Sequence, residues 1–131
     1  MSSEAQLHEA VCDYIRLKYP NVLFNSDMSG VKLTMGQAKK AKKLRSSKGF
    51  PDLVIYEPRN GKHGLFLELK RDGERLLKKD GSFKTKHLKD QSEVISKLNR
   101  TNYVALFAIG FDEAKEIIDG YLSGKIFKMV I

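Results

Sequence analysis

An alternating segment near the middle of the chain constrains the fold most. Within residues 64–71 leucine occupies every second position, at Leu65, Leu67 and Leu69. A β-strand points successive side chains to opposite faces. The three leucines are therefore predicted to face a core, while Glu68 and Lys70 point together from the other face of the same strand.

A second apolar run, residues 53–56, comes directly after Asp52. The two runs are separated by residues that favour turns, namely Pro58, Asn60, Gly61 and Gly64. This pattern predicts a hairpin of strands near 52–57 and 64–71. The hairpin would bring Asp52 close to Glu68 and Lys70, and two carboxylates beside an ammonium group suit a divalent metal ion and a phosphate.

Further helices and strands are predicted around this hairpin. Ser3 and Gln6 have the spacing of a capping box, and the helix after them should run to about Lys18. The other predicted elements are a strand at 22–24, a loop with at least a helical turn around 37–44, a mobile loop at 72–84, helices at about 85–99 and 111–122, and strands at 104–109 and 126–131. The order α-β-β-β-α-β-α-β predicts an α/β fold with a central mixed sheet flanked by helices. The length and the lack of linkers predict one domain over residues 1–131.

The composition indicates the cellular compartment and the kind of binding partner. The net charge of +8 and the pI of about 9.6 favour an anionic partner, most commonly nucleic acid. The single cysteine, Cys12, cannot form an internal disulfide, which fits a reducing cytoplasm. The sequence shows no signal-like N-terminus and no long apolar stretch, so no membrane association is expected.

The predicted hairpin site has the groups that phosphodiester cleavage needs. Asp52 and Glu68 are candidate ligands for Mg²⁺, and the backbone carbonyl of Leu69 can add a third oxygen. Lys70 can orient or deprotonate the attacking water, or stabilise negative charge on the phosphate. The alternative is a solvated strand face on which Glu68 and Lys70 simply pair.

Two helical residues extend this candidate site. Glu4 lies on the same helical stripe as Leu7, where it can be a metal ligand or merely a favourable charge at a helix N-terminus, whereas Glu9 lies on the outward face. Gln91 interrupts the apolar face of the helix at 85–99. Its amide can hydrogen-bond a metal-bound water, the lysine or a phosphate, or it can cap a backbone group, and both interpretations stay open.

Basic residues lie close to the candidate site in the sequence. The stretch 32–48 contains no acidic residue, and its candidate DNA-binding residues are Lys39, Lys40, Lys42, Lys43, Arg45 and Lys48. A more mixed group further along adds Arg71 and Lys86. These side chains are predicted to contact phosphates rather than bases, although a solvated loop is the alternative. The three histidines have no Cys or His partners at zinc-binding spacing.

Together these motifs resemble a known nuclease family. Asp52 followed by Glu68-Leu69-Lys70 resembles the PD-(D/E)xK superfamily. The fuller set is similar to the VRR-NUC family, in particular its small stand-alone members from phages and bacteria; it comprises Glu4, Gly49-Phe50-Pro51-Asp52-Leu53, Leu67-Glu68-Leu69-Lys70 and Gln91. The resemblance implies a restriction-endonuclease-like fold and Mg²⁺- or Mn²⁺-dependent cleavage of DNA. It also implies that Glu4, Asp52 and Glu68 bind the metal and that Lys70 is catalytic. Gln91 matches the glutamine of the family's helix after the motif.

Stand-alone members of that family are similar to Holliday junction resolvases and are expected to be homodimers. The leading hypothesis is therefore a four-way junction resolvase that acts in a bacterial cell or a phage-infected host. A two-fold homodimer would supply the two cuts that a junction needs. The alternatives are a nickase, a flap-type or restriction-like nuclease, or a non-catalytic DNA-binding module with a degenerate nuclease fold.

Overall fold

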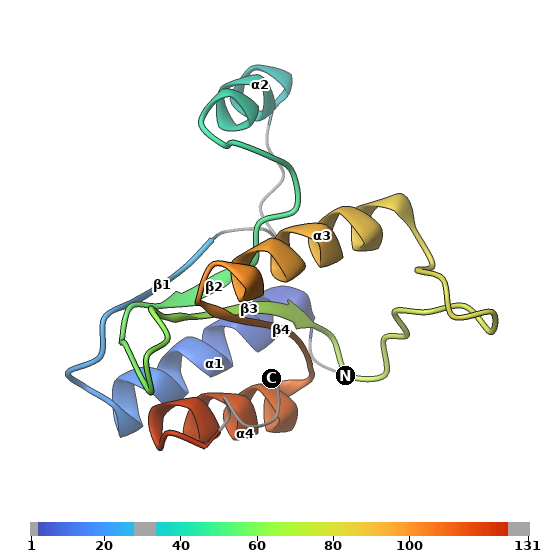
Figure 1. Cartoon of the computed structure of the whole chain (residues 1–131). Helices are drawn as coiled ribbons and strands as arrows, with labels where there is room; N and C mark the ends of the chain where they lie inside the picture. Colours follow the sequence, from blue (N-terminus) through green and yellow to red (C-terminus); the bar gives the residue numbers. More distant parts are fainter. Residues whose placement is uncertain (1–2, 28–33, 126–131) are drawn as a thin grey trace.

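A computed structural model of the protein describes residues 3–27 and 34–125. Its elements, in chain order, are α1 (Glu4–Lys18), β1 (Phe24–Ser26), α2 (Met35–Lys43), β2 (Leu53–Ile55), β3 (Leu65–Lys70), α3 (Lys86–Arg100), β4 (Val104–Ile109) and α4 (Phe111–Leu122). The strands form one sheet, with α1 and α4 packed on one face and α3 on the other (Figure 1). Among the described helices, none has both the length and the apolar character needed to cross a membrane.

The sheet is mixed, as predicted. Its strand order is β1-β2-β3-β4; the first three strands pair antiparallel, while β3 and β4 pair parallel. The hairpin register places Leu53 opposite Leu67 and Ile55 opposite Leu65. A parallel pair needs a crossover connection. The crossover here contains the 72–84 loop and α3, and it carries Gln91 onto the same side of the sheet as Glu68.

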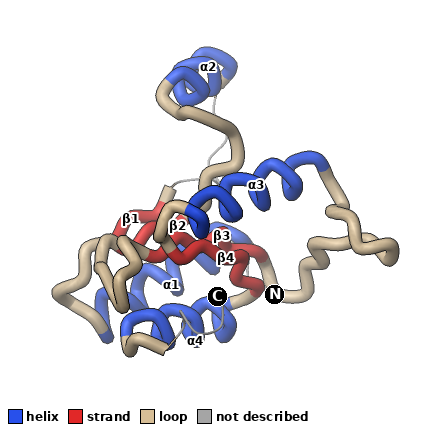
Figure 2. The backbone as a smooth tube through the Cα atoms, in the orientation of Figure 1, coloured by secondary structure: helices blue, strands red, loops and turns tan. Residues whose placement is uncertain are grey.

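The predicted alternation in β3 is confirmed. The leucines of this strand have no exposed surface and belong to the core between the sheet and the two helices below it, α1 and α4. Burial of large apolar side chains contributes about 1.5–3 kcal/mol each. This packing fixes the face of β3, and the alternation of a strand directs Glu68 and Lys70 to the opposite face. Helix α3 lies on that side of the sheet (Figure 2).

The first helix is held at both of its ends. The predicted capping box is present: the Gln6 N–H donates to Ser3 Oγ at 3.1 Å, and the Ser3 N–H donates to Gln6 Oε1 at 2.8 Å. Near the other end, the hydroxyls of Tyr14 and Tyr19 each donate to Asp119 of α4 at 2.6 Å. Burial alone would raise the pKa of Asp119, but these hydrogen bonds outweigh it and lower that pKa. The contacts fix the position of α1, and with it Glu4, relative to the sheet.

Two parts of the observed fold differ from the sequence prediction. The first strand lies at Phe24–Ser26 rather than 22–24, because its register is set by pairing with β2, where Phe24 lies opposite Ile55. Residues 35–43 form a complete helix, started by a capping box between Thr34 and Gln37. The predicted strand at 126–131 lies outside the described residues. The 72–84 segment is a loop, as expected, with one bridge between Leu77 and Phe83.

Candidate active site

Four charged or amide side chains are buried in the part of the chain that the structure describes. They are Asp52, Glu68, Lys70 and Gln91, with exposures of 5%, 2%, 7% and 4%. These are the same four residues that the sequence analysis singled out as catalytic candidates. Burying such groups costs free energy unless they pair or bind a cation, so their concentration in the core marks a candidate functional site.

Asp52 lies just beyond the point where the hydrogen-bonded pairing of β2 with β3 ends. The pairing of β2 with β3 stops at Leu67, and beyond it the Leu69 N–H donates to Asp52 Oδ2 at 3.3 Å. The N–H and C=O of one strand residue point to the same edge of the strand. The Leu69 carbonyl therefore faces the Asp52 side, while the Lys70 carbonyl accepts from the Gly110 N–H at 2.8 Å on the β4 side.

Gly49 brings the loop before Asp52 against α3. Its φ is +83°, and a Cβ added there would lie 2.9 Å from the backbone of both Asp90 and Gln91. Only glycine fits such a close approach in this conformation without strain. The contact places the loop before Asp52 beside Gln91, whose buried Oε1 has no hydrogen-bond partner among the described residues.

The electrostatics of Glu68 are those of a carboxyl held away from water. Burial is the main cause that raises its pKa, and a hydrogen bond and charge repulsion from Asp52 raise it further. Lys70 acts in the opposite direction, with its Nζ 3.6 Å from Glu68 Oε2. Within the described structure, the buried Oε1 of Glu68 has no hydrogen-bond partner. A cation beside this oxygen would relieve the cost of its burial.

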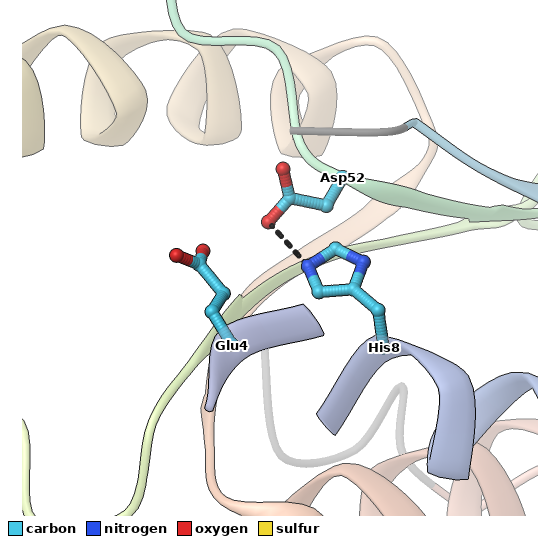
Figure 3. A group of neighbouring side chains, drawn as sticks. All are labelled: Glu4, His8 and Asp52. Atoms are coloured by element: carbon cyan, nitrogen blue, oxygen red, sulfur yellow. Dashed lines mark ion pairs between the residues drawn. The ribbon is translucent and has the colours of Figure 1, made fainter. Parts of the chain in front are cut away.

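Helix α1 adds two side chains to the same place. Ligand atoms of Glu4, His8 and Asp52 all lie within 4.8 Å of one another, and the two helical side chains point toward Asp52 (Figure 3). His8 Nε2 is 3.5 Å from Asp52 Oδ2. Glu4 also adds to the negative potential that raises the pKa of Glu68. Glu9, the other acid considered for this helix, is exposed.

His8 is the residue that sequence reasoning missed. The sequence prediction considered the histidines only as zinc ligands with Cys or His partners at the usual spacing. The available signal was the four-residue spacing from Glu4, which places both side chains on one face of a helix.

The basic residues fall into three groups. The four lysines of α2 are exposed, the helix has no buried residue, and it stands apart from the sheet (Figure 1). The structure therefore does not bring these lysines to the carboxylates. Lys48 and Arg71 are exposed on the segments that flank Asp52 and Lys70. Two predicted DNA contacts have acidic partners: Arg45 pairs with Asp27 at 3.0 Å and Lys86 with Asp90 at 3.5 Å.

Comparison with known proteins supports the fold. No family model matches the chain, and no curated protein matches it. A solved structure described as a VRR_NUC domain protein superposes with a TM-score of 0.69 at 24% sequence identity. The chain has a VRR_NUC-type fold. The match covers 95% of this chain and 91% of the other, so it includes nearly all of both molecules. The predicted resemblance and the restriction-endonuclease-like fold class are confirmed at the level of the fold.

Proposed function

We propose that this protein is a metal-dependent DNA endonuclease that hydrolyses phosphodiester bonds, acts as a homodimer and prefers four-way junctions. The proposal rests on one observation. The buried side chains of Asp52, Glu68 and Lys70 lie together at one place in the fold, with Glu4 beside them. A fold shared with a VRR_NUC domain protein agrees with it.

The donor set fits Mg²⁺ or Mn²⁺. Glu4, Asp52, Glu68 and the Leu69 carbonyl would hold the ion, because hard divalent cations prefer oxygen ligands and Glu68 Oε1 is buried without a hydrogen-bond partner among the described residues. When bound, such an ion supplies an activated water and neutralises charge on the phosphate. The Leu69 N–H holds one oxygen of Asp52 and so restricts the rotation of that carboxylate.

Lys70 and Gln91 would act on the substrate side. The Lys70 ammonium, 7% exposed and held beside Glu68, can hydrogen-bond a phosphate oxygen or orient the attacking water. The Gln91 amide can hydrogen-bond the lysine, a metal-bound water or a phosphate. Its buried Oε1 has no partner among residues 3–27 and 34–125, which supports this role over backbone capping. The expected result of Lys70→Ala is a loss of cleavage of about 10²–10⁴-fold.

The rest of the molecule would bind the DNA backbone. The net charge of +8 and the exposed lysines of α2, together with Arg45, Lys48, Arg71 and Lys86, favour contact with phosphates. One chain carries one such site and would cut one strand. A two-fold homodimer would present two sites to the two strands of a junction that must be cut.

The test is Mg²⁺-dependent cleavage of a synthetic four-way junction beside a flap and a linear duplex. Wild type is compared with Lys70→Ala and with Lys97→Ala, an exposed lysine of α3 that serves as control. Paired symmetric nicks in the junction alone, lost only in Lys70→Ala, support the proposal. Cleavage of flap or duplex instead would leave a nickase, flap-type or restriction-like nuclease. Tight binding without cleavage in Mg²⁺ or Mn²⁺ would indicate a non-catalytic DNA-binding module.

A further inference from the structure

We propose that His8 is a nitrogen ligand of the bound metal and makes the site selective for Mn²⁺ over Mg²⁺. The inference rests on the proposed metal site and deepens it, since oxygen ligands alone would give no strong preference between these two ions. It starts from the position of the imidazole ring between Ser26 of β1 and Asp52 of β2.

Both nitrogens of His8 are held in defined surroundings. Nδ1 lies 2.8 Å from Ser26 Oγ, and Nε2 is directed toward Asp52 (Figure 3). The His8 side chain is 12% exposed, and its buried Nε2 has no hydrogen-bond partner within the described residues. A buried ring nitrogen of this kind is costly unless something binds it.

The separation from Asp52 suits two ligands of one ion. Nε2 and Asp52 Oδ2 are 3.5 Å apart, well beyond the usual 2.9–3.0 Å of an N–H···O hydrogen bond. Ligand atoms that each lie about 2.1 Å from an ion stand about 3 Å from one another. A small inward movement of either side chain would therefore bring both to the spacing of two ligands on one cation, and a Glu4 carboxylate oxygen lies within 4.8 Å of both.

Ser26 would fix the tautomer that metal binding requires. A ligating histidine usually donates its other ring N–H to a nearby oxygen, which orients the ring and increases its basicity. With Nδ1–H donating to Ser26 Oγ, the lone pair of Nε2 faces the carboxylates. Burial raises the pKa of the Cys12 thiol, and the Ser26 hydroxyl acts against it, as a hydroxyl hydrogen directed toward the sulfur would. A hydroxyl hydrogen directed at the sulfur leaves the oxygen lone pairs for His8.

A nitrogen ligand changes which ions the site prefers. Carboxylate, carbonyl and water suit Mg²⁺, whereas imidazole raises affinity for transition-metal ions along the Irving–Williams series, in which Mn²⁺ is the weakest member. His8→Gln should therefore weaken Mn²⁺ binding more than Mg²⁺ binding. We expect the ratio of the two dissociation constants to change by about tenfold, the lower end of what loss of a supporting group costs a metal site.

The test measures the coordination of the bound metal directly, in the whole chain and without DNA. Electron spin echo measurements on Mn²⁺-loaded wild type should show coupling to a histidine nitrogen, and labelling with ¹⁵N-histidine should alter that coupling. Calorimetric titration with Mn²⁺ and with Mg²⁺ gives the affinity ratio. His8→Gln should lose the coupling, while His63→Gln, at an exposed position near the β2–β3 hairpin, should keep it.

The possible results separate this inference from the proposed function. Bound Mn²⁺ without nitrogen coupling, together with normal cleavage, would overturn the role of His8 and leave the nuclease intact. Absence of both metal binding and cleavage would overturn both proposals. Because the labelled wild type carries the decisive signal, the test does not depend on whether His8→Gln folds, and Ser26→Ala should weaken Mn²⁺ binding in the same direction.

Discussion

At the scale of single residues, the geometry of the site depends on Gly49, which has no reactive group. Gly49→Ala should destabilise the protein by about 2–4 kcal/mol, because it adds strain at positive φ to a clash with the backbone of α3. Gly73→Ala is the matched control: Gly73 has φ +78°, yet nothing lies within 4 Å of its added Cβ. Urea unfolding of both variants measures the difference, and equal losses would contradict the close packing of the loop on α3.

Glu68 predicts a pH dependence of stability in protein freed of metal by a chelator. Its folded-state pKa is raised above the ordinary value of 4.5, so its contribution to stability is complete below that pH and is lost as pH rises. Between about pH 5 and about pH 9, wild type should lose at least about 1 kcal/mol more stability than Glu68→Gln.

Urea unfolding across this range measures the Glu68 effect, because other titrating groups are common to both proteins and cancel in the comparison. Added Mg²⁺ should restore wild-type stability at high pH and have less effect on Glu68→Gln, since a cation compensates the ionised carboxyl. Parallel pH profiles of the two proteins would show that Glu68 is not buried as described.

At the scale of elements, α2 stands apart from the sheet (Figure 1). Its lysines are exposed and it has no buried residue, so replacing them should leave folding unchanged. Lys39→Ala combined with Lys43→Ala should weaken DNA binding and reduce the slope of log affinity against log salt by about 0.9 for each lost phosphate contact.

A matched double variant tests whether the position of these charges matters. Lys62→Ala with Lys97→Ala removes the same charge from the hairpin and from the far end of α3. Filter binding or fluorescence anisotropy at several salt concentrations gives both slopes. If both double variants lower the slope equally, the protein binds through its overall charge and α2 is not a dedicated contact.

The elements that sequence reasoning predicted well are those with a strong apolar period. Alternating leucines specified β3, and the apolar stripe of α1 specified its buried face, because the same core that buries these side chains also creates the pattern. The helix α2 has no such stripe, since it packs on nothing that could impose one. Its signal was the capping pair Thr34 and Gln37, which the prediction did not use.

The placement of side chains from distant segments was harder to predict. The meeting of Asp52 with Glu68 followed from the hairpin, a local feature of the chain. The approach of His8 did not, because it depends on how α1 packs across the sheet and on the pairing of β1 with β2. Gly49 likewise shows its role only through contact with α3, which lies some 40 residues further along the chain.

At the scale of the whole molecule, the number of candidate sites in each chain sets the proposed mode of action. A junction is resolved only when two opposed strands are cut, and each chain offers a single group of Asp52, Glu68 and Lys70. If the protein is a two-fold dimer, each subunit should cut one strand. Dimers that contain one wild-type and one Lys70→Ala subunit, purified through two different tags, separate this arrangement from its alternatives.

A supercoiled plasmid with an extruded cruciform shows the number of cuts directly. Wild-type dimers should linearise it, because both opposed strands are cut within one encounter. Mixed dimers should yield nicked circles and almost no linear product. The Lys70→Ala subunit should keep its fold and its surface contacts to DNA but lack the ammonium group that cleavage needs. Linear product from mixed dimers would mean that one site cuts both strands in turn. If the protein binds the plasmid as a monomer, cleavage does not need a second subunit.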